Sequence, residues 1–126
     1  MAEWSAGQRV RLVQDHRAPD RPALRVKVGD VVTLGKNDDR TWPAFIWAVD
    51  AAGVGGWVPE RYFRRLDEAG AAEVVHDYDT TELSADEGSV VEVVDVDVDS
   101  GWLWCRADDG AVGWVPILAL EQLEPR

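Results

Sequence analysis

Apolar and polar residues alternate with a period of two along most of the chain, which is typical of half-buried β-strands. Val, Ile, Thr and Trp are frequent in these stretches, as is usual for strands. Glycine, proline and acidic residues separate them and predict loops and turns. The pattern predicts strands over 8–13, 26–34, 45–49, a stretch ending at 59, and 63–66, with one helical turn at 60–62. It then restarts with strands over 73–76, 90–94, 102–106, 111–116 and 120–123. Polar loops are expected over 15–22, 77–87 and 95–100.

The restart is a sequence repeat. Gly56-Trp57-Val58-Pro59 and Gly113-Trp114-Val115-Pro116 are the same four residues placed 57 positions apart, and Trp47 and Trp104 share that spacing. In each copy the Trp and Val side chains point to opposite faces of a strand, and proline ends it because it has no N–H for the next ladder bond. The chain is therefore predicted to form two small β domains, 1–67 and 71–126, joined by a short linker and held by a fixed interface.

The composition limits which cross-links, metal sites and partners the protein can have. Seven Trp provide apolar area for two small aromatic cores, while a single cysteine, Cys105, excludes an intrachain disulfide and a cysteine zinc site. Residues 1–66 hold eleven Lys/Arg and eight Asp/Glu (+3), and residues 67–126 hold two and sixteen (−14). The halves should therefore attract each other, or the second half should attract a basic ligand. This acidity argues against nucleic acid as a partner. Without an apolar leader or a run of about 20 apolar residues, we expect a cytoplasmic protein that does not enter a membrane.

Several motifs of the second repeat, taken in order, resemble the Src homology 3 (SH3) domain in its bacterial-type variant form. The resemblance covers residues 8–66 and 72–123 and rests on Val74-Val75-His76-Asp77-Tyr78, Glu82-Leu83-Ser84-Ala85, Glu87-Gly88, Gly101-Trp102-Leu103-Trp104 and the Gly113–Pro116 strand. It implies an all-β fold of two tandem SH3-like five-stranded small barrels. It also implies a shallow aromatic groove that binds proline-rich segments, with an acidic loop residue that holds a ligand Arg or Lys. Polyproline II suits such a groove because it is already ordered before it binds.

The resemblance places peptide-binding residues in both repeats. In the second repeat the groove walls would be Tyr78, Trp102 and Pro116, with His76 at the family's first Tyr position, and with Glu82, Asp77 and Asp79 as the negative charges. In the first repeat the surface would be Pro59, Tyr62 and Trp42, although Phe45 fits the groove position as well as Trp42 does. Gln14 and His16 replace both tyrosines of the first repeat, and Ala23 replaces its acid, so the first repeat is expected to be the poorer binder.

Other features favour structural interpretations. Trp47, Trp57, Trp104 and Trp114 are expected in the core or between the repeats, Trp4 over the other repeat, and Asp95, Asp97 and Asp99 on a solvated strand face. Neither a cofactor site nor a catalytic motif is recognisable, and the two histidines, His16 and His76, lack the neighbours of a metal site. The function predicted is a non-catalytic adaptor that binds proline-rich or basic peptides. The alternatives are a structural or self-association module, whose grooves are occluded between the repeats or in a homodimer, and a cell-wall-binding module.

Overall fold

The structure is a computed structural model, and it describes residues 3–37 and 41–123. Its regular elements are strands and two single 3-10 turns, as the alternating pattern predicts. They are β1 (Arg9–Leu12), β2 (Arg25–Val26), β3 (Val31–Leu34), β4 (Phe45–Val49), β5 (Gly55–Pro59), η1 (Glu60–Tyr62), β6 (Phe63–Arg65), β7 (Ala71–Val74), β8 (Tyr78–Asp79), β9 (Val90–Asp97), β10 (Trp102–Arg106), β11 (Val112–Pro116), η2 (Ile117–Ala119) and β12 (Leu120–Gln122). Within the described part of the chain, no helix has the length and apolar character needed to cross a bilayer.

The two compact units of the structure do not coincide with the two sequence repeats. The first unit consists of Met1–Asp20 and Thr81–Arg126, and the second unit is Arg21–Thr80. The predicted boundaries, 1–67 and 71–126, describe the sequence repeats but not these spatial units. Each unit has one five-stranded sheet, with strand order β11-β10-β9-β1-β12 in the first unit and β5-β4-β3-β7-β6 in the second. The first strand of each repeat has therefore joined the sheet of the other repeat.

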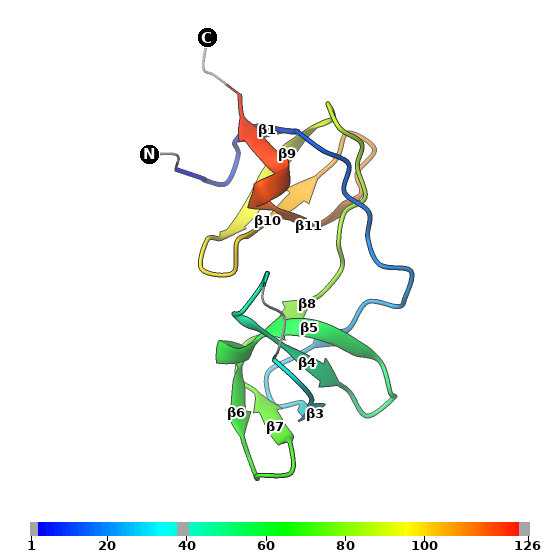
Figure 1. The fold of residues 1–126 in the computed structure, drawn as a ribbon, viewed down its shortest axis with the longest axis vertical. Coiled ribbons are helices and arrows are strands. Elements are labelled where there is room, and N and C mark those ends of the chain that lie inside the picture. The colour runs from blue at the N-terminus through cyan, green and yellow to red at the C-terminus, as the bar shows by residue number, and fades with distance from the viewer. Residues whose placement is uncertain (1–2, 38–40, 124–126) are drawn as a thin grey trace. The chain divides into compact units, whose positions relative to one another are not determined.

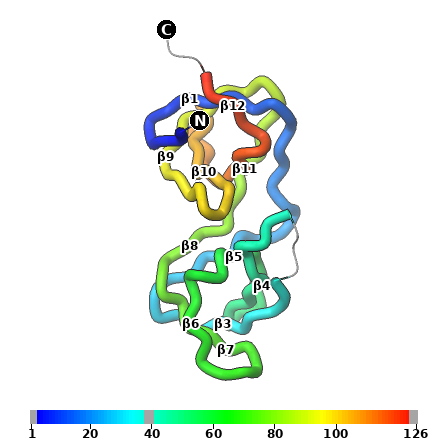
Figure 2. The backbone as a smooth tube through the Cα atoms, turned by 60° about the vertical axis from the view of Figure 1, so that its left-hand side comes forward, coloured from blue at the N-terminus to red at the C-terminus, as the bar shows by residue number. Residues whose placement is uncertain are grey.

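Figures 1 and 2 show this exchange. The blue β1 lies among the yellow-to-red strands of the first unit, and the green β7 lies beside the cyan β3 of the second. We name residues 9–20 arm 1 and residues 71–80 arm 2. The pairings are equivalent: Leu12 of arm 1 is opposite Leu120, and Val74 of arm 2 is opposite Phe63. The last two residues of arm 2 belong to the two-stranded ladder β2–β8.

Each unit has its own aliphatic core, which buries side chains from both sequence repeats. In the first unit Val10 and Leu12 of arm 1 pack with residues such as Leu103 and Val115, and these four side chains are at most 1 % exposed. In the second unit Val74 of arm 2 is fully buried in a cluster of residues from the first repeat. Because the arms contribute buried side chains, neither core is complete without the exchange.

The cores are aliphatic, although the number of tryptophans suggested aromatic cores. Trp47 and Trp57 are partly buried and meet edge to face across β4 and β5, and Trp104 and Trp114 do the same across β10 and β11. They lie on the strand face opposite the buried Ile46 and Leu103 rows, because side chains alternate along a strand. Trp4 packs against the core of the first unit, which is built largely from strands of the second repeat, as expected.

The acidic stretch after Val94 is partly strand rather than loop, because β9 continues to Asp97. Trp104 is paired with Asp95 and Cys105 with Val93, so Val94 is an extra residue, a β-bulge, in β9. The bulge shifts by one residue which side chains of β9 face the core, so that Val96 packs against it. Asp95 is exposed, in agreement with a solvated face, whereas Asp97 is partly buried.

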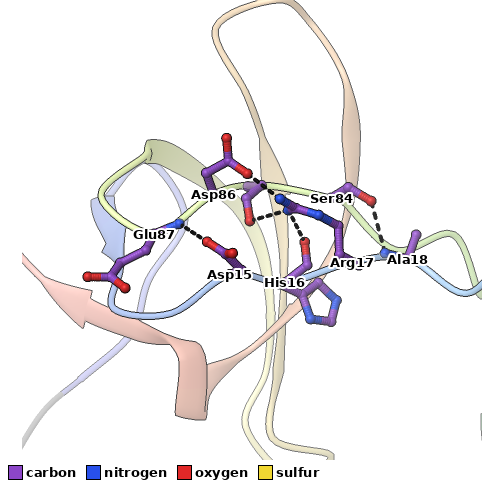
Figure 3. A network of polar contacts seen from close by, with 8 residues as sticks. Asp15, His16, Arg17, Ala18, Ser84, Asp86 and Glu87 are labelled. Atoms are coloured by element: carbon purple, nitrogen blue, oxygen red, sulfur yellow. Dashed lines mark hydrogen bonds and ion pairs between the residues drawn. The ribbon is translucent and has the colours of Figure 1, made fainter.

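Polar contacts fasten arm 1 to the second repeat (Figure 3). The Arg17 guanidinium forms an ion pair with Asp86 and donates to the Ala85 carbonyl at 3.0 Å, and the Asp15 carboxylate accepts the Glu87 N–H at 2.7 Å. Arm 2 is held likewise: Arg64 pairs with Glu73. The basic first repeat and the acidic second repeat thus pair inside each unit.

Candidate functional site

Three aromatic rings form a continuous wall in the second unit. Tyr62, at the end of η1, is stacked on His76 with the ring centroids 4.3 Å apart and the planes at 12°. Tyr78 is 5.6 Å from Tyr62 and tilted by 55°. Tyr62 and Tyr78 are partly buried and His76 is exposed, so the wall borders solvent. The first repeat supplies Tyr62, and arm 2 supplies the other two rings.

The end of β5 precedes η1 in the chain, but its Pro59 side chain is less than 2 % exposed and adds no area to this surface. Pro59 is opposite Phe45, as Pro116 is opposite Trp102 in the first unit. Phe45 is therefore the positional equivalent of Trp102, but it is only 6 % exposed. Trp42 precedes it in the turn and is partly buried. The ring closer to solvent here is thus Trp42, even though the register assigns the position to Phe45.

The charges beside this wall are mixed. The Asp79 carboxylate forms an ion pair with Arg25 at 3.0 Å, and the Asp77 carboxylate accepts the Val28 N–H at 2.8 Å. The Arg61 guanidinium lies 4.6 Å from the centre of the Tyr62 ring, a cation–π distance. This surface therefore offers rings, while both acids already have partners.

The first unit has a smaller ring surface with an acid beside it. The rings of His16, from arm 1, and Trp102 form a T-shaped pair with centroids 5.7 Å apart and planes at 71°. His16 Nε2 lies 3.0 Å from Glu82 Oε1, and both side chains are largely buried, at 14 % and 19 % exposure. Pro116, opposite Trp102 at the end of β11, is buried. Rings, proline and carboxylate thus meet at the end of the β10–β11 hairpin.

The backbone of Glu82 is fixed against β11. The Leu83 N–H donates to the Trp114 carbonyl at 3.1 Å, and the Trp114 N–H donates to the Thr81 carbonyl at 2.9 Å. Gly113 makes this approach possible, since a Cβ there would lie 2.6 Å from the Glu82 carbonyl carbon and the Leu83 nitrogen. The carboxylate is therefore presented from a rigid segment.

The exchange divides the groove predicted for the second repeat. Tyr78, His76, Asp77 and Asp79 lie in the second unit with Pro59, Tyr62 and Trp42, whereas Trp102, Pro116 and Glu82 lie in the first unit. The sequence placed Tyr78 and Trp102 in one groove, whereas in the structure arm 2 carries Tyr78 into the second unit and Trp102 belongs to the first. The first repeat, expected to be the poorer binder, provides Tyr62 to the ring wall that is richer in tyrosines, while its Pro59 is fully buried.

Sequence reasoning missed two neighbours of these grooves. His16 was noted only as the replacement of a tyrosine in the first repeat, but it lies against Trp102 of the second. Arg61 was not considered. The sequence could have indicated Arg61, because it directly precedes Tyr62 in a predicted helical turn. The position of His16 beside Trp102 follows only from the exchange of the arms.

The remaining reactive group, Cys105, is fully buried in β10. Burial raises the pKa of its thiol from 9.0 to about 12, so the thiol stays protonated and unreactive in the folded protein. Among residues 3–37 and 41–123, no cluster of three or more His, Cys, Asp or Glu is arranged to hold a metal ion.

Comparisons with known proteins identify the two sequence repeats as copies of one domain. The family model for the variant SH3 domain matches twice, over residues 9–64 and 72–123. The chain is 26 % identical over 125 residues to the SH3 and PX domain-containing protein 2B of Mus musculus; the match covers 88 % of this chain but only 13 % of that protein. No solved structure matches it significantly. The two family matches cover most of the chain, which therefore belongs to the variant SH3 family of protein-interaction domains and carries two copies of the domain.

Proposed function

We propose that the protein is a non-catalytic adaptor whose two grooves bind proline-rich segments of partner proteins. The observation that supports this most strongly is the ring wall of Tyr62, His76 and Tyr78 in the second unit. Flat rings complement the ridges of a polyproline II helix, which loses little conformational entropy on binding. Because arm 2 supplies two of these rings, the groove needs both sequence repeats.

The two grooves should prefer different ligands. The first unit holds five Lys/Arg and fourteen Asp/Glu (−9), and the second holds eight and ten (−2). Glu82 is the acid at the family's ligand-binding position in the first unit, where it can form a charge-assisted bond to a ligand Arg or Lys. In the second unit Ala23 occupies the matching position, and Arg61 adds a positive charge. We expect apolar proline-rich segments at the second unit and segments with a basic residue at the first.

Nitrogen-15 NMR of the full chain tests this proposal. A pool of proline-rich peptides, with and without Arg, would be added to millimolar concentration. Signals of Tyr78 and of the Trp102 indole should shift, and Tyr78→Ala should abolish the response of the second unit. Trp57→Phe is the matched control, because its ring lies in an edge-to-face pair with Trp47 rather than in the wall. If neither Tyr78 nor Trp102 responds to any peptide, the proposal is wrong.

A second candidate function is self-association, which the arm exchange favours. Arms 1 and 2 could be exchanged between two copies of the chain with the same pairings, a low-cost route to a dimer. Intrachain exchange has the higher effective concentration, so we expect a monomer at micromolar concentration. Light scattering over a concentration series separates the two: a dimer that persists on dilution would favour self-association.

A further inference from the structure

The carboxylate that a basic ligand would need in the first unit already has a partner within the chain. His16 Nε2 is 3.0 Å from Glu82 Oε1. An ionised carboxylate only accepts hydrogen bonds, so Nε2 must carry the hydrogen, whether the imidazole is neutral or charged. The same ring forms a T-shaped pair with Trp102. His16 therefore lies against both the aromatic ring and the acid of this groove.

His16 is held in this place by arm 1. Its backbone N–H and carbonyl both bond to Ala85, each at 2.9 Å, and the following residue, Arg17, pairs with Asp86. Figure 3 shows the contacts of the residues on either side of His16, Asp15 with the Glu87 N–H and Arg17 with Asp86. The imidazole thus comes from a segment fixed at several points, and a ligand could displace the ring only by rotating its side chain.

We infer that His16 is a specificity-determining residue that competes with the ligand's Arg or Lys for Glu82. This inference rests on the proposed peptide-binding function of the first unit. A guanidinium forms its strongest pair with a carboxylate through both oxygens, and His16 occupies one of them. A guanidinium that binds both oxygens of Glu82 must therefore displace His16 from Oε1 or share that oxygen with it, whereas a ligand without a cation need not. The effect lowers the selectivity of the groove for basic segments without closing it to proline-rich ones.

Selectivity is the measurement that isolates this role. Two proline-rich peptides that differ only by one Arg→Gln change would be titrated into the full chain and followed at the Trp102 indole signal. The His16→Phe variant keeps a ring edge against Trp102 but cannot donate to Glu82. It should increase the preference for the Arg peptide on the order of tenfold, since hydrogen bonds to charged groups have this strength. His16→Gln is the matched control, because its amide still donates, and it should leave the preference within about threefold of the unmodified chain.

The unmodified protein provides an independent measurement in case the Phe variant does not fold. Saturation with the Arg peptide should shift the His16 imidazole nitrogen signals as Nε2 leaves Glu82, and the Gln peptide should not shift them. The inference is wrong if preference is unchanged in His16→Phe, if both variants raise it equally, or if the imidazole signals stay constant while Trp102 responds to the Arg peptide. A normal response at Tyr78 in those cases leaves the proposed function intact; silence at both Tyr78 and Trp102 overturns both.

Discussion

The arm exchange makes an unusual prediction about where a core substitution acts. Leu12 is 1 % exposed and lies in the first sequence repeat, but its side chain is in the core built on the second. Leu12→Ala should destabilise the first unit by about 2–5 kcal/mol, the usual cost of removing a buried leucine side chain. Val74 is the matched position of the second repeat and is fully buried in the other core. Val74→Ala should cost the second unit about 2 kcal/mol.

Cys105 reports on the first unit alone. It is the only cysteine in the sequence, it is fully buried in the first core, and its thiol is unreactive while folded. A thiol reagent therefore reacts through opening of that unit, and the rate follows the opening free energy. Since each 1.4 kcal/mol is a factor of ten, Leu12→Ala should raise the labelling rate about 30-fold to a few thousand-fold. Val74→Ala should leave it nearly unchanged.

The relative labelling rates of Leu12→Ala and Val74→Ala distinguish exchanged arms from sequential domains, in which each repeat folds with its own arm. If each repeat folded on its own arm, Val74 would share a core with Cys105 and Leu12 would not. Faster labelling in Val74→Ala than in Leu12→Ala would therefore refute the exchange. Amide hydrogen exchange in β5 supplies the reciprocal measurement, because Val74→Ala should reduce protection at Val58, and Leu12→Ala should not.

Three further outcomes follow from single contacts. Folding raises the pKa of the Cys105 thiol, so the contribution of this group to the free energy of unfolding is complete below pH 9 and is lost as the pH rises toward 12. In denaturant melts over that range, the free energy of unfolding should fall more steeply than in Cys105→Ala, by up to about 1.4 kcal/mol per pH unit. Gly113→Ala should cost about 1–3 kcal/mol in chemical denaturation, because its Cβ would meet the Glu82–Leu83 backbone at 2.6 Å; an unchanged midpoint would contradict the close approach. Arg17→Met should cost no more than about 1 kcal/mol, since the pair with Asp86 is exposed; a larger loss would mean that ion pairs rather than apolar burial hold arm 1.

Local structure was predictable because it depends on local patterns. The Gly-Trp-Val-Pro phrases end β5 and β11 as predicted, and the turns that follow are η1 and η2. The alternation at 102–106 matches β10 residue for residue. The two-residue strand β8 was missed because Tyr78 and Asp79 show no alternation long enough to be recognised. The bulge at Val94 was also missed, since an extra residue looks like a break between strand and loop.

The choice of partner strand was not predictable, because both repeats offer nearly the same interface. Leu12 opposite Leu120 and Val74 opposite Phe63 use equivalent positions, so the alternation is satisfied whichever sheet the arm joins. The residue roles inferred from the SH3 resemblance stay predictions, and their grouping assumed that neighbours in sequence share a groove. His16 beside Trp102 and Tyr78 beside Tyr62 depend on the exchange alone.

The exchange has a local cause at the two places where the chain passes between units, 20–21 and 80–81. A two-residue hairpin needs positive φ, and every described residue with positive φ in this chain is a glycine. Neither crossing segment, 18–22 or 79–82, contains glycine or asparagine. Pro19 and Pro22 also favour extended backbone at the residues before them. The backbone bends at Asp20 and Arg21, but neither segment forms a tight hairpin turn, and each arm joins the other sheet.

Converting each crossing into a tight turn should reverse the exchange. Replacing Asp20-Arg21 and Thr80-Thr81 by Asn-Gly provides two hairpin turns and changes no buried core residue. Because the two topologies use equivalent core pairings, relief of about 1–2 kcal/mol per strained turn residue is enough to favour the sequential one. In this background Val74→Ala should accelerate Cys105 labelling, and Leu12→Ala should no longer do so. If Leu12→Ala still controls the labelling rate, the crossings are not the cause, and the exchange must originate in the pairing of the arms with their sheets.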